Sequence, residues 1–255
     1  MLGKVKMVPM VHAARFVTVR GSATAVALLI TLGIPPTAAA QSAQPASGIP
    51  QLSGILEQRG RGNTPPADWV SALTTRAKAV IAAFDEYAAP KYDCVAATSP
   101  RVIDETLYNV RIEQLPDRVN LYYEKDDVVR TVWLEGHGHP EPRSGEYFLQ
   151  GYSTGRYENG QLVVVTTKFT YDPHGISDAS PFIPSTQRKK VTERYWREGN
   201  MVKVDVVTED PLILTKPVRF GWQWEFTKTP WMPFDCSIET NLTMLRFLPK
   251  RYPEP

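Results

Sequence analysis

The chain has 255 residues, with 29 basic and 27 acidic side chains and a formal net charge of +2. The first 40 residues carry Lys4, Lys6, Arg15 and Arg20 and no acid, so 29 minus these four leaves 25 basic residues against 27 acidic ones. Nucleic-acid binding depends on neutralising phosphates with basic groups, so this balance excludes a nucleic acid as an expected partner.

The first 40 residues have the order of a secretory signal peptide. A basic stretch is followed by the apolar run Ala23–Ile34 and then by small residues that end at Ala40. The run is too short to span a bilayer as a helix. We therefore expect cleavage after Ala40, no integral membrane span in the mature chain, and a periplasmic or secreted location. An uncleaved amphipathic anchor is the alternative.

Residues 41–66 are rich in Ser, Ala, Gln, Gly and Pro, which predicts a flexible leader before a single domain over residues 67–255. One helix is expected from about Trp69 to Tyr87, with Asp68 as its cap and an end at Ala89-Pro90. Its apolar residues recur at helical spacing, namely Trp69, Leu73, Ala77, Val80, Ile81 and Phe84.

From about residue 100 the apolar period changes to two, which indicates strands separated by tight turns such as Asn159-Gly160 and Gly199-Asn200. The expected strands are Leu107–Gln114, Arg118–Lys125, Val128–Leu134, Tyr147–Tyr157, Leu162–Thr170, Arg188–Arg197, Met201–Glu209 and Gly221–Thr227. This series predicts a mainly β fold, in which a single antiparallel meander closes into a lipocalin-like β-barrel and so removes its exposed edges.

Alternation along the strands assigns side chains to faces. A hairpin about Gly199-Asn200 places Arg194 beside Asp205. Before Asn159-Gly160, one face holds Tyr152, Thr154, Arg156 and Glu158, and the other holds Ser153, Gly155 and Tyr157. The sequence leaves open which of these two faces lies inside the barrel.

Cys94 and Cys236 are the two cysteines of the chain. Two cysteines in an oxidising compartment usually pair, and this bridge would close a loop worth roughly 4–5 kcal/mol at most in chain entropy. Two free buried thiols are the alternative.

Short motifs follow one another in an order that resembles a broad group of exported, functionally uncharacterised bacterial proteins. The matching residues are Tyr92-Asp93-Cys94, Pro100-Arg101, His139-Pro140, the Gly151-x-Ser153-x-Gly155-x-Tyr157-Glu158 stretch, Glu193-Arg194, Glu209-Asp210-Pro211, Thr215-Lys216-Pro217 and Cys236. The resemblance covers roughly residues 90–245 and implies a single exported β-domain with paired cysteines, but no particular reaction. Tyr152 replaces a histidine of the pattern and Val165 an aspartate, which lowers the expectation of catalysis here.

The segment around residue 138 is the only one with a metal-like spacing. Glu135, His137, His139 and Glu141 alternate along the chain, and imidazoles with carboxylates suit a first-row divalent ion. The intervening Gly and Pro residues break a regular strand, so an ordinary polar loop is favoured. We expect no metal or other cofactor, with His137 and His139 as the residues to test.

Two sets of side chains are candidates for function. Tyr hydroxyls, Arg groups and a Trp stripe can line and orient a ligand in an apolar pocket, although Trp stripes are more often core. This set contains Tyr152, Arg156, Glu158, Arg194, Trp222 and Trp224. Candidates for acid–base work are Glu193, Arg194, Tyr152 and Tyr157, for which cross-strand ion pairs on a wet face are the alternative.

The leading hypothesis is that the barrel binds a small apolar or amphipathic molecule. A cofactor-free isomerase, cyclase or hydratase on the same barrel is the first alternative, and a structural or assembly partner in the cell envelope is the second. The first alternative requires the acid–base candidates to converge in one cavity.

Overall fold

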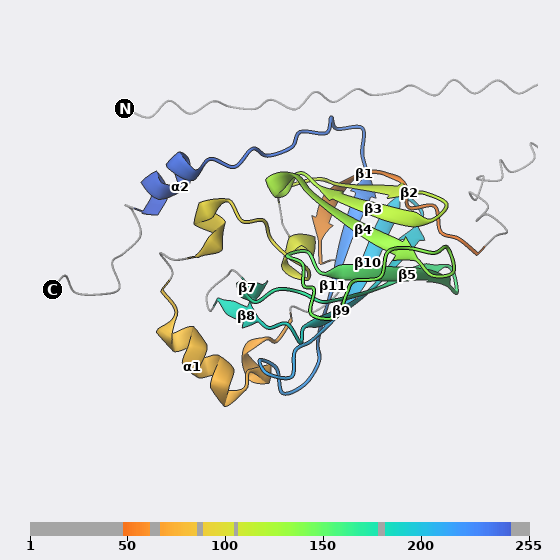
Figure 1. The fold of residues 1–255 in the computed structure, drawn as a ribbon. Helices are drawn as coiled ribbons and strands as arrows, with labels where there is room; N and C mark the ends of the chain where they lie inside the picture. The colour runs from red at the N-terminus through yellow and green to blue at the C-terminus, as the bar shows by residue number, and fades with distance from the viewer. Residues whose placement is uncertain (1–47, 62–66, 86–88, 105–106, 178–181, 246–255) are drawn as a thin grey trace, which may run out of the picture. The chain divides into compact units, whose positions relative to one another are not determined.

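The computed structural model describes residues 48–61, 67–85, 89–104, 107–177 and 182–245, all within the compact unit Ser42–Pro255. Nine strands of this part of the chain close into a barrel (Figure 1), which confirms the predicted fold class. The predicted signal peptide lies outside the described residues. In barrel order the strands are β1 (Gly54–Gly60), β11 (Val218–Phe226), β10 (Met201–Glu209), β9 (Lys190–Glu198), β6 (Gln161–Thr167), β5 (Tyr152–Glu158), β4 (Val128–Leu134), β3 (Arg118–Tyr123) and β2 (Val110–Gln114).

Alternation gives the barrel strands an inner and an outer face, as the period of two predicts. Along β10, Val202 and Val206 are buried, whereas Lys203 and Asp205 are partly exposed. The predicted β9–β10 hairpin is confirmed in register, because Arg194 pairs with Asp205. Burial of apolar surface stabilises the fold by roughly 25 cal/mol per Å², so the inward-facing valines favour closure of the barrel.

The closing strand, β1, lies inside the segment whose composition predicted a flexible leader. It pairs antiparallel with both β11 and β2, so the leader prediction is wrong for residues 54–60. Leu56 is fully buried and is the inward anchor of this short strand. The composition of residues 41–66 could not reveal this, because the strand is stabilised by two edges that lie far away in the sequence.

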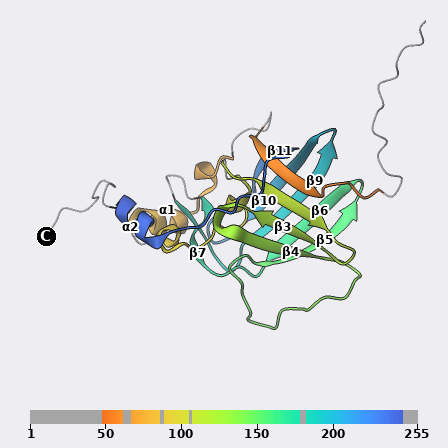
Figure 2. The same cartoon turned by 90° about the horizontal axis from the view of Figure 1, so that it is seen from above.

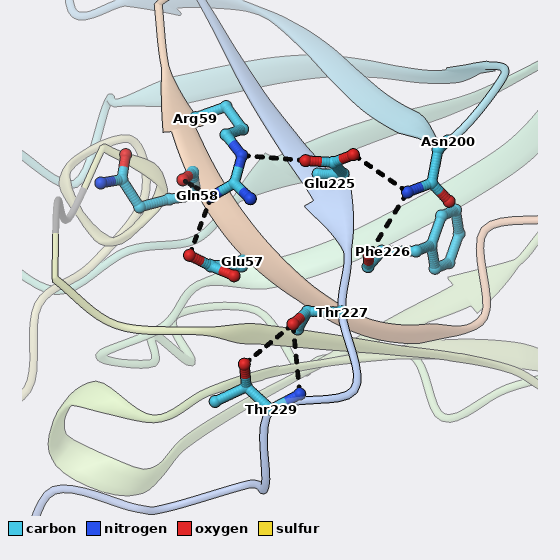
Figure 3. Close-up of polar contacts among 8 residues, drawn as sticks. All are labelled: Glu57, Gln58, Arg59, Asn200, Glu225, Phe226, Thr227 and Thr229. Atoms are coloured by element: carbon cyan, nitrogen blue, oxygen red, sulfur yellow. Dashed lines mark hydrogen bonds and ion pairs between the residues drawn. The ribbon is translucent and has the colours of Figure 1, made fainter.

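Charges on the outer face hold β1 against β11 (Figure 3). The register sets Glu57 directly opposite Glu225, a repulsive pair by itself. Arg59 donates a hydrogen bond to Glu57 at 2.8 Å and another to Glu225 at 3.0 Å, and Asn200 donates to Glu225 at 3.1 Å. The bond from Arg59 lowers the pKa of Glu57, and the bonds from Asn200 and Arg59 lower the pKa of Glu225.

One neighbouring pair of barrel strands is parallel and so departs from the expected antiparallel meander. Only Val132–Leu134 of β4 pairs with β5, and the connection over residues 135–151 runs outside the barrel wall (Figure 2). A tight reversal cannot join parallel strands, because the chain must return to the end from which it came. The strand expected from Tyr147 therefore begins only at Tyr152.

The predicted helix over 69–87 is shorter than expected and is divided in two. A 3-10 turn, η1 (Val70–Ala72), precedes the helix α1 (Thr75–Ala83). Between them, Leu73 is extended and forms a bridge with Leu214, so a tertiary pairing overrides the helical period. Asp68 accepts from the Ser71 amide at 3.1 Å, and the cap of α1 is instead Thr74, whose hydroxyl accepts from the Ala77 amide.

The smaller elements gather around the barrel. The two-stranded sheet of β7 (Asp172–Ser177) and β8 (Ile183–Ser185) lies with α1 at one end of the barrel (Figure 1). A second apolar cluster, which includes Ala77, Ile183 and Leu214, holds these elements together. Short 3-10 turns occur at η4 (Arg101–Ile103) and η5 (Lys125–Asp127).

The predicted cysteine pair is confirmed. Cys94 follows the 3-10 turn η3 (Pro90–Asp93), and Cys236 precedes the helix α2 (Ile238–Leu245), with 5.7 Å between their Cα atoms and a sequence separation of 142. Such a disulfide is compatible with an extracytoplasmic, oxidising location. Within the described ranges, none of the helices has the length and apolar character needed to cross a membrane.

Candidate functional site

Buried side chains occupy the inside of the barrel, where a lipocalin-like pocket would require open space. Trp224 is 1% exposed, and Trp222 and Phe220 are buried beside it on the inner face of β11. The ring of Tyr195 stacks on that of Trp224, with 6.4 Å between ring centroids. Trp222 and Trp224, which the sequence suggested as ligand contacts, are therefore buried in the core cluster of the barrel.

A charged pair crosses the interior of the barrel. Arg130 of β4 donates to Glu193 of β9 at 2.9 Å, and the two side chains are 1% and 0% exposed. Glu193 also accepts hydrogen bonds from Ser99 at 2.6 Å and from Tyr195 at 2.7 Å. The guanidinium donates further to Thr166 at 3.1 Å. Every charge in this cluster is paired, which is the condition for burying charges without a large cost.

The electrostatics of the cluster favour a fixed ion pair over proton transfer. Burial lowers the pKa of Arg130, but the carboxylate of Glu193 and the neighbouring tyrosines outweigh it and leave that pKa raised. Burial, followed by the charge of Glu193, raises the pKa of Tyr195 well above its ordinary value. Arg130 therefore stays charged and Tyr195 stays protonated at physiological pH, so the cluster is a cross-link between strands.

A second buried polar cluster joins the segment before η4, strand β7 and the residue before β9. Lys189 donates to the Thr98 hydroxyl at 3.1 Å and to the Gly175 carbonyl at 2.9 Å, and Thr98 donates to Asp172 at 3.0 Å. Burial lowers the pKa of Lys189 to about 7, although Asp172 acts in the opposite direction. The ammonium also lies 4.0 Å from the ring centroid of Phe169. Lys189 is thus a buried amine whose pKa is lowered toward neutrality.

The parallel seam between β4 and β5 opens into a cleft of about 330 Å³, here called the seam cleft. β4 forms one wall, and the connection from β4 to β5 forms the other. Aromatic and apolar side chains alternate with carboxylates and an amide along these walls. The lining side chains include those of Val129, Trp133, Glu141, Glu146, Phe148, Gln150 and Tyr152.

Tyr152 provides polar contacts at one side of the seam cleft. Its hydroxyl is hydrogen-bonded to Nδ1 of His139 and donates to the Pro140 carbonyl at 2.9 Å. Because a hydroxyl has one hydrogen, Nδ1 of His139 then carries the hydrogen of the other bond. His139 also stacks on Trp133, with 6.1 Å between centroids. Burial and the nearby Glu141 raise the pKa of Tyr152, so its hydroxyl remains a neutral hydrogen-bonding group.

A larger and more polar cleft, of about 770 Å³, lies at the opposite end of β5. Arg156, Tyr157 and His137 line it, together with Gln114 and residues of the segment before β1. The Tyr157 hydroxyl accepts from Gln114 at 2.9 Å, and burial raises its pKa. This cleft is separate from the seam cleft, which contains Tyr152.

The remaining predicted site residues do not join either cleft. Glu158 and Arg194 are on the outer face, 3.8 Å apart, and Glu158 also pairs with Arg156 at 2.8 Å. Glu193 is inside the barrel, so the four acid–base candidates do not converge in one cavity. Among the described residues, no group of three or more His, Cys, Asp or Glu is arranged to hold a metal. His137 lines the larger cleft, whereas His139 is hydrogen-bonded to Tyr152.

Sequence reasoning missed Arg130 and most of the seam cleft. Arg130 could have been found from the sequence. In the strand "VVRTVWL" it is the one charged residue, and it shares a face with Val128, Val132 and Leu134, which are buried. Trp133 and Phe148 had none, because their proximity depends on the parallel pairing of β4 with β5. No protein-family model matches this chain, and a search of curated proteins found no match, so the site rests on its own geometry.

Proposed function

We propose that this protein is exported and binds a small amphipathic molecule in the seam cleft, rather than in the centre of the barrel. The observation that carries the proposal is the meeting of Trp133, Phe148 and Tyr152 around one cleft of about 330 Å³. Ligand sites are typically concave, mostly apolar, and fitted with a few polar groups that set orientation.

The two parts of the cleft suit the two parts of an amphipathic ligand. Phe148 and Val129 are 40% and 49% exposed, so a ligand that covers them removes apolar surface from water. Tyr152, Gln150 and Glu141 supply hydrogen-bonding groups on the same walls. The ligand is therefore expected to combine an aromatic or aliphatic body with a hydrogen-bonding group.

The export part of the proposal is supported by two features. The first 40 residues have the composition of a signal peptide, and Cys94 is bonded to Cys236. A disulfide persists in an oxidising compartment such as the periplasm and is rare in the cytosol. Detection of a mature chain that begins at Gln41, by mass spectrometry of the protein from its host, tests this part.

Titration with the neutral fluorophore Nile red tests the binding part. Wild-type protein is expected to give a saturable rise in emission. Phe148→Ser is expected to weaken binding about tenfold, which corresponds to about 1.4 kcal/mol. Leu107→Ser is the matched control, because Leu107 is 85% exposed and does not line the cleft. Wild-type emission that does not saturate, or equal losses in the two variants, would contradict the proposal.

A further inference from the structure

The hydrogen-bond parity of β4 identifies which of its backbone groups face the seam cleft. The amide of Leu134 donates to the Asp117 carbonyl at 3.0 Å, in register with the β3–β4 ladder. In an antiparallel ladder hydrogen-bonded pairs alternate, so Val132 and Arg130 also bond toward β3. The backbone groups of Val129 and Thr131 therefore point to the opposite edge, toward β5.

On that edge β5 does not extend far enough to pair with them. The ladder with β5 begins at Val132 and Ser153, which in a parallel pair uses the Thr131 carbonyl. Among the described residues, no backbone hydrogen bond joins the Val129 N–H, the Val129 C=O or the Thr131 N–H to the segment before β5. These three groups form an unpaired strand edge in the wall of the cleft.

The chain before β5 is held away from this edge by its own contacts. The Phe148 amide donates to the Lys168 carbonyl at 2.8 Å, and the Thr170 amide donates back to Phe148 at 3.0 Å, so this segment pairs beyond β6. Gly151 then turns the chain into β5 with a φ of +72°, a conformation that side chains disfavour. The gap between β4 and this segment is thus built into the fold.

The side chains around the edge indicate what could fill it. Val129, Phe148 and the adjacent Leu149 are each more than a third exposed. Glu141 and Glu146 are the acidic lining residues, and the one basic lining residue, Arg130, is already paired with Glu193. A partner for this surface must supply backbone-like donors and acceptors, apolar side chains and positive charge.

We propose that the ligand of the seam cleft is an extended, cationic peptide segment that adds to β4 as a short strand. This mode is β-augmentation, in which main-chain hydrogen bonds provide affinity and alternate side chains provide specificity. The peptide would accept from the amides of Val129 and Thr131 and donate to the Val129 carbonyl. The inference rests on the proposed function, because it specifies the ligand class of the same cleft.

The test uses the full exported chain and the pentapeptide acetyl-Lys-Val-Phe-Val-Lys-amide. The same peptide with every internal amide N-methylated is its control, because it keeps the side chains and charge but its methylated main-chain nitrogens cannot donate. We expect the parent peptide to displace Nile red and the methylated peptide to bind at least about tenfold more weakly. In ¹H–¹⁵N spectra the Val129 and Thr131 amides are expected to gain protection from hydrogen exchange.

A pair of variants tests the protein side. Val129→Pro removes an amide that is unpaired in the free protein, so the ladder with β3 is retained, whereas Val129→Ala keeps that amide. Peptide binding is expected to be lost in the first variant, whereas the second loses only the apolar contact of the Val129 side chain and binds more weakly than wild type but measurably. The peptide readouts stand on wild-type protein, so they decide the matter even if Val129→Pro fails to fold.

The outcomes separate the two proposals. Nile red binding that the peptide does not displace, or equal binding of parent and methylated peptides, overturns the peptide inference and leaves the proposed function standing. Peptide binding without protection of Val129 and Thr131 also overturns the inference. Absence of saturable binding for both Nile red and the peptide overturns both.

Discussion

Arg130 of β4 and Glu193 of β9 form an ion pair through the middle of the barrel, 2.9 Å apart and closed off from water. The two strands are not neighbours, since β5 and β6 lie between them in the barrel order. The pair therefore ties opposite parts of the wall together, and Ser99, Tyr195 and Thr166 add further hydrogen bonds to it.

Loss of one partner of this pair is expected to be costly. Arg130→Met or Glu193→Leu leaves a buried charge without its partner, and we expect each to lower the free energy of unfolding by roughly 3–5 kcal/mol. The double variant removes both charges and is expected to cost less than the sum of the single changes. Urea denaturation of the four proteins measures this coupling, and strict additivity would show that the pair does not act as a unit.

Lys189 is expected to make stability depend on pH above neutrality. Its pKa in the folded chain is about 7, below the ordinary value of 10.5, so between these values the unfolded chain binds more protons than the folded chain. Stability therefore rises as pH increases from 7 toward 10, by at most about 1.4 kcal/mol per pH unit, and the cost of burying the charge is fully present below pH 7.

The measurement is the free energy of unfolding at pH 7, 8 and 9 for wild-type protein and for Lys189→Met. The difference between the two proteins isolates the contribution of Lys189 from that of other titrating groups. We expect the wild-type protein to gain stability relative to the variant as the pH rises. Parallel pH curves would show that Lys189 does not change its charge in this range.

Leu56 tests whether β1 is an integral strand of the barrel. In a flexible leader Leu56 would be exposed, whereas in the structure it is fully buried. Leu56→Ala is therefore expected to lower the free energy of unfolding by roughly 2–5 kcal/mol. Ile55→Ala is the matched control, because Ile55 is the next residue on the same strand and only partly buried. The measurement is a comparison of the denaturation midpoints of the two variants. Equal and small effects would show that residues 54–60 do not form a strand of the barrel.

Gly151 links the fold to the seam cleft. A Cβ at this position would lie 2.6 Å from a Thr166 methyl and 2.8 Å from the Phe169 ring, besides being strained at a positive φ. Gly138→Ala is the control, because Gly138 has a similar φ of +64° and no atom within 4 Å of its added Cβ. We expect Gly151→Ala to lose more stability and to reduce Nile red binding, whereas Gly138→Ala costs only about 1–2 kcal/mol of backbone strain. Unchanged dye binding in Gly151→Ala would show that the turn at Gly151 does not determine the shape of the seam cleft.

The barrel class and several strand boundaries could be predicted from local patterns in the sequence. The bounds of β4 and β10 agree with the expected strands Val128–Leu134 and Met201–Glu209, and the β9–β10 register agrees with the turn at Gly199-Asn200. These features depend on a local period of two and on short turns, so they can be read from neighbouring residues. The cysteine pair also followed from the sequence, because two cysteines allow a single intramolecular pairing.

The closure of the barrel wall and the position of the seam cleft depend on contacts between residues that are far apart in the sequence. The leader segment became β1, Leu73 left the helical pattern to pair with Leu214, and β4 met β5 in parallel. Tyr152 was placed outside the barrel core and beside Trp133, whereas Trp222 was buried within it. Each outcome depends on partners that are distant in the chain, and their pairing energies exceed the weak preferences that local composition expresses.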